Sequence, residues 1–176
     1  MAETIHRALD AVYLACIWVA GACIFLMSLF IPWGIFARYV LGTGAQWPEP
    51  ISILLMVIFT FLGAAAAYRA GAHIAVAMLT ERMPPELRRV MAFAVSVLML
   101  LVSMFMVYYG TSLCIGTWQQ SIPALPWMPV GLTYVPVPLG GFITLLFVLE
   151  FLAAGDQSQR DVVRFDLMDE AKDGAA

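Results

Sequence analysis

Charged side chains are scarce in this chain of 176 residues. Asp, Glu, Lys and Arg together make up 12% of it, whereas about 25% is usual for a soluble domain. Apolar residues make up 62%, and the mean hydropathy is +0.89. A soluble protein of this size cannot hide so much apolar surface. The composition therefore excludes a cytosolic globule and a disordered chain, and it indicates a membrane protein.

Several kinds of site chemistry are also missing from the sequence. The 9 Lys and Arg residues against 12 Asp and Glu residues leave no basic surplus for phosphates, so we expect no nucleic-acid partner. The 3 cysteines form no CxxC pair, which argues against a disulfide framework and a zinc site, and Cys114 is given no role. No HExxH, nucleophile elbow or phosphate loop occurs in the sequence. We therefore expect no enzyme activity, no metal and no cofactor.

The spacing of the charges predicts the membrane spans. Residues 11–37, 50–68 and 90–149 contain no Asp, Glu, Lys or Arg. A helix needs roughly 20 apolar residues to cross a hydrocarbon layer of about 30 Å. The last stretch is long enough for two helices, and prolines near its middle separate them. The predicted fold is an all-α integral membrane protein with four transmembrane helices at about 11–37, 50–69, 90–113 and 133–154.

The two ends of the chain differ from its middle. Apolar residues recur at helical spacing among the charges of the first twelve residues. This pattern predicts a short N-terminal amphipathic helix that lies along the membrane surface before the first span begins. Residues 1–155 are expected to form one four-helix membrane domain, and residues 156–176 a charged cytoplasmic tail.

Basic residues predict which way the chain faces. With four spans, both termini and the 69–89 loop lie on one side, and this side holds every Lys and Arg except Arg38. Basic residues of short loops stay on the cytoplasmic side. We therefore expect both termini to be cytoplasmic, with the 38–49 and 114–132 loops facing outward.

Ionisable residues are missing from the middle of the predicted spans. A transporter that works alone usually keeps such groups deep in the membrane. The deepest acid is Glu150, about one turn from the inner end of the fourth span, and we expect its carboxylate to reach the interface. The small residues of 63–67 suit close helix packing, either within this bundle or against a partner subunit.

Several short segments, taken together with the four-span layout, resemble the small permease subunit (DctQ type) of the tripartite ATP-independent periplasmic (TRAP) transporters. The resemblance covers nearly the whole chain and depends on the order and spacing of these segments: Arg38-Tyr39-Val40, Trp47-Pro48-Glu49, Phe61-Leu62-Gly63-Ala64, Tyr68 to Ile74, Met83-Pro84, Arg88, Pro123, Pro126 and Tyr134 to Gly140. The sequence departs from the family where Pro50 follows Glu49, since a second acid often stands there. It departs again at 75–77, which is apolar rather than charged.

The resemblance implies a multi-pass protein of the bacterial inner membrane that does not carry substrate itself. It implies a large permease subunit as partner, which moves substrate and sodium. It also implies a periplasmic binding protein that delivers an organic acid through transient contact. Membrane lipid is the remaining expected partner. The transported substrate cannot be predicted from this chain.

Seven residues are candidates for partner contacts or structural roles: Arg38, Trp47, Glu49, Arg69, His73, Trp118 and Trp127. Arg38 and Glu49 either pair across the outer hairpin or stand as independent interfacial charges. The 114–132 loop, with its two tryptophans, is either a plain interfacial loop or a contact for the binding protein or large subunit. His73, near Arg69, is either exposed at the interface or meets a lipid phosphate or partner carboxylate.

Two other functions remain open at this point. A self-sufficient small exporter working as an oligomer would need a membrane-embedded acid, for which Glu150 is the nearest candidate. A redox or quinone-linked enzyme would need paired cysteines or buried histidines, and the two histidines, His6 and His73, fall near the inner surface.

Overall fold

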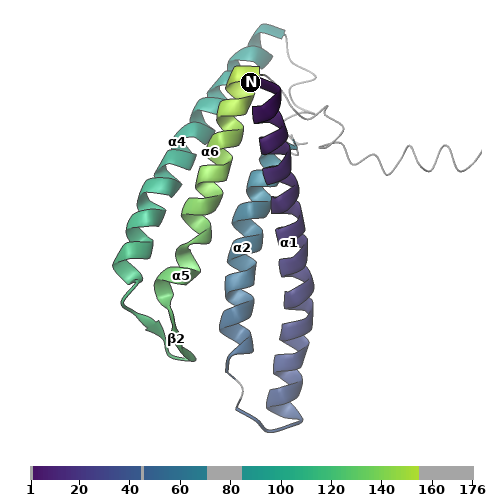
Figure 1. Cartoon of the computed structure of the whole chain (residues 1–176), viewed down its shortest axis with the longest axis vertical. Coiled ribbons are helices and arrows are strands. Elements are labelled where there is room, and N and C mark those ends of the chain that lie inside the picture. Colours follow the sequence, from purple (N-terminus) through teal and green to yellow (C-terminus); the bar gives the residue numbers. More distant parts are fainter. Residues whose placement is uncertain (1, 45, 71–84, 155–176) are drawn as a thin grey trace, which may run out of the picture.

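Long helices make up most of the computed structural model, which describes residues 2–44, 46–70 and 85–154. Within these ranges the elements are α1 (Ala2–Tyr39), α2 (Pro48–Arg69), α4 (Pro85–Thr117), β1 (Ser121–Ile122), β2 (Leu125–Pro129), α5 (Val130–Tyr134) and α6 (Pro136–Ala154) (Figure 1). Four segments are long and apolar enough to cross a membrane: His6–Tyr39, Pro48–Arg69, Phe93–Thr117 and Val130–Ala153. The all-α membrane fold predicted from the sequence is confirmed.

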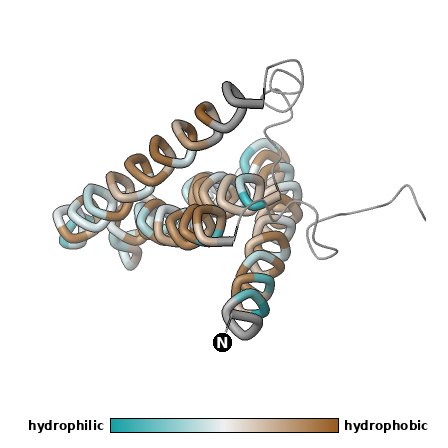
Figure 2. Tube along the Cα trace, turned by 90° about the horizontal axis from the view of Figure 1, so that it is seen from above, coloured by the Kyte–Doolittle hydropathy of each residue, from teal (hydrophilic) through white to brown (hydrophobic). Residues whose placement is uncertain are grey.

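The long helices pack as a row in the order α1, α2, α6, α4, with α1 beside α2 and α4 beside α6 (Figure 1). The span that contains α6 is the most buried of the four, because 39% of its most apolar stretch is buried, against 17% in each of the other three spans. Hydrophobic residues also lie on the outward sides of the helices (Figure 2). Trp18 and Phe25, for example, are 78% and 70% exposed. Such surface is stable only against lipid or another apolar protein.

The first helix runs without a turn from Ala2 to Tyr39. The first residues are helical as expected, but they continue into α1 without a break and do not form a separate short helix. A stripe of buried residues explains the continuity, since Tyr13, Cys16, Ala20 and Cys23 follow one another at spacings of three and four. Leu9 and Val12 pack against the same core cluster, so this face of α1 contacts the bundle from Leu9 onward.

Small residues allow the helices of the row to approach closely. Ala65 and Ala66 on α2 are buried in a core cluster with Tyr13 of α1 and Phe147 of α6. For these two alanines the structure supports packing within the chain's own bundle. Gly140 on α6 faces α2, and a Cβ atom there would lie 2.7 Å from the Cβ atom of Phe61. The close α2–α6 contact therefore depends on the absence of a side chain at Gly140.

The segment 114–132 has more regular structure than a plain loop. After α4 ends, β1 and β2 form a two-stranded antiparallel hairpin in which Ser121 pairs with Pro129 and Ile122 with Leu125. Leu125 and Met128 are 5% and 2% exposed, so the hairpin has its own buried side. The helix ends at Thr117, six residues before Pro123, and β2 contacts the short helix α5 that follows it.

We expect Gly140→Ala to lower the free energy of unfolding by about 1–3 kcal/mol, because overpacking forces backbone or side chains apart. The matched control is Gly116→Ala on α4, where an added Cβ would meet nothing within 4 Å. Thermal or SDS unfolding of the purified protein in detergent measures both. Equal stability of the two variants would contradict the close α2–α6 contact.

Candidate functional site

The most strongly connected charged side chain in the described part of the structure is Arg69, in the last turn of α2. It is 4% exposed, and four of its N–H groups donate hydrogen bonds. Nε donates to Glu150 Oε2 at 2.8 Å, and Nη2 donates to Glu150 Oε1 at 3.0 Å. This two-point contact between guanidinium and carboxylate is the strongest geometry that such a pair adopts.

The same guanidinium also holds the first helix. Nη2 of Arg69 donates to Asp10 Oδ1 at 2.7 Å, and Nη1 donates to the backbone oxygen of Leu9 at 3.1 Å. The rings of Tyr13 and Phe147 lie against the guanidinium, with their centroids 5.5 and 5.2 Å from its carbon atom. Arg69 therefore joins α1, α2 and α6 through charge, hydrogen bonds and aromatic contact.

His6 completes what we call the buried ion cluster: His6, Asp10, Arg69 and Glu150. His6 Nδ1 lies 2.9 Å from Glu150 Oε1, so both oxygens of this carboxylate have partners. The side chain of Glu150 is 2% exposed. The expectation that Glu150 reaches the interface is wrong, because the acid is enclosed between α1 and α2 and neutralised by Arg69.

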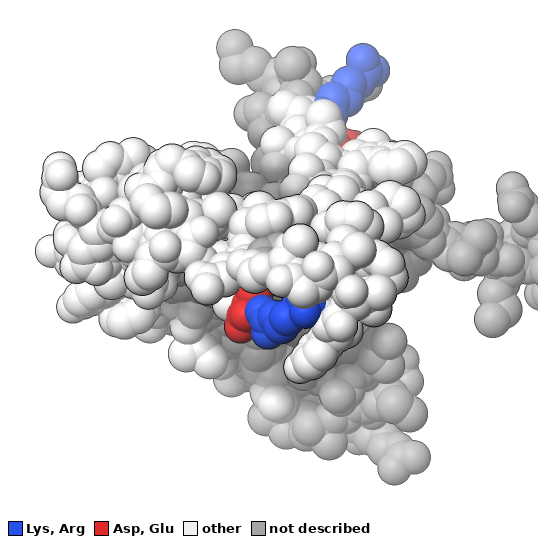
Figure 3. Space-filling model, turned by 90° about the horizontal axis from the view of Figure 1, so that it is seen from below, with Lys and Arg blue, Asp and Glu red and all other residues white. Residues whose placement is uncertain are grey.

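A second ion pair joins the other end of α1 to the start of α2. Arg38 Nη2 lies 3.6 Å from Glu49 Oε2, and their side chains are 54% and 72% exposed. Of the two interpretations of Arg38 and Glu49, the structure supports the pair, and both side chains stay more than half exposed. Seen from this end, an acidic and a basic patch adjoin within an uncharged surface (Figure 3).

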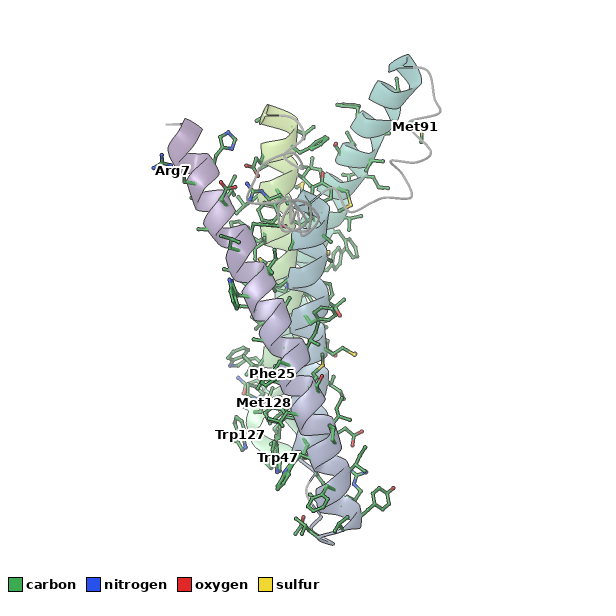
Figure 4. All side chains as sticks on the ribbon, turned by 90° about the vertical axis from the view of Figure 1, so that its right-hand side faces the viewer. Arg7, Phe25, Trp47, Met91, Trp127 and Met128 are labelled. Carbon is green, nitrogen blue, oxygen red and sulfur yellow. The ribbon has the colours of Figure 1, made fainter. Side chains whose placement is uncertain are left out.

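The candidate tryptophans gather at the same end as this pair. Trp47 precedes α2, and its ring meets that of Phe30 edge-on at 5.8 Å. Trp127 is 74% exposed and Trp118 is 50% exposed. Figure 4 shows Trp47 and Trp127 toward one end of the molecule and Arg7 toward the other. His73 lies outside the described residues.

The two ion pairs are about one membrane thickness apart. Glu49 and Arg69 stand near opposite ends of α2, and at about 1.5 Å per residue the helix between them spans about 30 Å. This equals the usual hydrocarbon thickness. Each charge also suits its helix end, since an acid near the N-terminus and a base near the C-terminus both interact favourably with the helix dipole.

Sequence reasoning singled out Arg69 but missed His6 and Asp10 as its neighbours. A usable signal exists, because His6, Asp10 and Tyr13 lie four and three residues apart and so share one helix face. Arg69 and Glu150 also stand near span ends that four crossings bring to the same side. Opposite charges at one depth on neighbouring spans would have indicated the pair.

We expect Arg69→Leu to lower the free energy of unfolding by about 3–5 kcal/mol, because it leaves two buried carboxylates without their cation. The double variant Arg69→Leu/Glu150→Leu should recover part of that loss. Arg38→Gln, which breaks the exposed pair, should change stability by about 1 kcal/mol or less. Unfolding in detergent measures all three. A loss for Arg69→Leu as small as that for Arg38→Gln would contradict the arrangement.

Comparison with known protein families gives a match over most of the chain. Residues 27–157 match the family described as tripartite ATP-independent periplasmic transporters, DctQ component. The matched region contains Arg38, Glu49, Arg69 and Glu150, and it leaves out His6 and Asp10.

Two curated proteins are similar over 80% or more of their length. The chain is 28% identical over 162 residues to the ectoine TRAP transporter small permease protein TeaB of Halomonas elongata, covering 91% of this chain and 80% of that protein. It is 25% identical over 143 residues to a TRAP transporter small permease protein of Haemophilus influenzae, whose assignment is provisional, covering 81% and 84%. The chain therefore belongs to the DctQ family of TRAP transporter small permease subunits, a family of multi-pass membrane proteins.

Proposed function

We propose that the chain is a non-catalytic scaffold subunit of a sodium-coupled TRAP transporter in the bacterial inner membrane. On this proposal it binds the large permease subunit, which moves the substrate, and a periplasmic binding protein delivers an organic acid to the assembly. Family membership supports the transporter. The scaffold role is supported by the pairing of the buried charges with one another.

The observation that carries the proposal is the saturation of the buried ion cluster. An ion-coupled carrier needs an embedded group that takes up and releases its ion, and such groups face a pathway or a water-filled cavity. In the described residues, the carboxylate of Glu150 is 2% exposed and bound to Arg69 and His6. Arg69 is in turn bound to α1 and α6. These contacts suit a structural link between helices better than a transport site.

The same contacts weaken the alternative, a self-sufficient small oligomeric exporter. That function needs an acid free to exchange protons or cations within the membrane, and Glu150 was the nearest candidate. Releasing it would leave Arg69 with less than its full set of buried partners, at a cost of several kcal/mol. The scaffold function makes no such demand.

We also propose an orientation and a contact face. The 69–89 side, which is rich in basic residues, faces the cytoplasm, because Lys and Arg of short loops remain there. The exposed side chains of Arg38, Trp47, Glu49, Trp118 and Trp127 then face outward. We propose that this end meets the partner subunits, since exposed aromatic and arginine side chains are typical of protein interfaces.

We expect no gradient-driven uptake of carboxylates by proteoliposomes that contain this chain alone. Vesicles that also contain the large permease of the same transporter, supplied with its binding protein, should take up substrate in a sodium-dependent way. Radiolabelled organic acids and a collapsed sodium gradient provide the readout and the control. Uptake by the chain without any other protein would favour the exporter.

We expect Arg38→Ala to reduce several-fold the amount of large permease that co-purifies with the chain. Removal of Arg38 leaves Glu49 without its counter-charge at a surface that assembly takes out of water, which is costly. Arg7→Ala is the matched control, because it removes the same charge at the opposite end of the molecule (Figure 4). Equal recovery of the permease with both variants would contradict the proposed contact face.

A further inference from the structure

A cavity of about 420 Å³ lies between α1 and α2 near the Arg38–Glu49 pair. We call it the α1–α2 groove after the two helices that line it. Most of its lining is apolar and includes Met27, Phe30, Ile31, Ile53 and Met56, and Arg38 and Glu49 also contribute. Three of the lining side chains, Ile31, Ile53 and Met56, are 47–52% exposed, so the groove opens to the outside of the bundle. Neither the scaffold role nor the proposed contact face accounts for a groove that reaches below the charged pair.

The groove has a defined depth in the membrane. Glu49 is separated by about 30 Å of helix from Arg69, so the Arg38–Glu49 pair lies at the level where hydrocarbon gives way to lipid headgroups. Met56 is two helical turns below Glu49, or about 10 Å. The groove therefore begins at headgroup level and continues into the hydrocarbon region.

The volume of the groove, about 420 Å³, lies within the range of about 300–1,000 Å³ that is usual for ligand pockets. An unbranched acyl chain is thin and flexible enough to follow such a groove. Met27 and Met56, which lie at the end of the groove away from the charged pair, suit such a ligand, since flexible thioether side chains adapt to irregular apolar shapes.

The charges at the mouth indicate which headgroup fits. A guanidinium binds phosphate oxygens through parallel N–H donors, and a carboxylate accepts hydrogen bonds from an ammonium group. Arg38 and Glu49 offer both groups 3.6 Å apart and largely exposed. A zwitterionic headgroup with phosphate and primary ammonium matches both charges, whereas an anionic headgroup without ammonium would face Glu49 unfavourably.

We propose that the α1–α2 groove binds one phosphatidylethanolamine molecule, with an acyl chain between α1 and α2, its phosphate at Arg38 and its ammonium at Glu49. The lipid fills the groove and covers apolar surface that the chain leaves open. The headgroup then lies within the proposed contact face, because Arg38 and Glu49 belong to both, whereas the acyl chain lies below that face.

The test uses the full-length chain in nanodiscs that contain equal amounts of phosphatidylethanolamine and phosphatidylglycerol, followed by release into mild detergent and native mass spectrometry. The wild-type protein should retain phosphatidylethanolamine over phosphatidylglycerol by about fivefold, the effect of one modest charge contact. Glu49→Gln should bring the two lipids close to parity. Absence of a preference in the wild-type protein would overturn the proposal.

Two tryptophan variants locate the bound lipid. Ile31→Trp places a large ring in the groove and should abolish retention, whereas Leu101→Trp on α4 makes the same kind of change outside it. Both positions are similarly exposed, at 51% and 58%, so neither change disturbs the core. Circular dichroism checks that each variant remains helical. Retention of the lipid by Ile31→Trp, or its loss from Leu101→Trp, would contradict the assignment.

A photo-crosslinking amino acid at position 53 identifies the occupant in native membranes. Ile53 lines the groove and is 47% exposed. A covalent phosphatidylethanolamine adduct supports the proposal. A cross-linked dimer would assign the groove to a second copy of the chain, and a cross-link to the large permease would assign it to the partner. Either protein product in place of the lipid overturns the proposal.

Discussion

The arrangement of this bundle depends on a single guanidinium that has been taken out of water. An unpaired arginine within an apolar bundle would be prohibitively costly, so Arg69 is stable there only while Glu150 and Asp10 stay beside it. Those two acids belong to the fourth and first spans of the chain. The requirement to satisfy one side chain therefore fixes where α1 and α6 stand relative to α2, and with them the register of the small residues that pack below.

Much of the fold can be predicted from one-dimensional information. The intervals between charges predict four spans, because a helix that crosses the membrane needs a long stretch of sequence with few charges. The pairing of Glu150 could not be predicted in this way, since hydropathy treats a charge near a span end as a boundary rather than as a partner. The continuity of α1 was missed for a related reason: His6 and Asp10 resemble surface charges, although they share a helix face with the buried Tyr13.

The two charged levels of the molecule differ in their surroundings and therefore in what they can do. The buried ion cluster is enclosed and saturated, which suits the holding of helices in place. The Arg38–Glu49 pair is exposed beside tryptophans and an apolar groove, which suits contacts with molecules outside the chain. A row of helices with open apolar sides provides the large lateral surface that a scaffold subunit needs.

The central claim is that the embedded charges hold the bundle together and take no part in ion coupling. The most direct measurement is substrate uptake per assembled complex by the whole transporter carrying Glu150→Gln, because glutamine keeps the shape of the side chain but cannot titrate or carry a charge. The account predicts a lower yield of complexes, each with an uptake rate close to that of the wild type. Fully assembled complexes that no longer transport would contradict it.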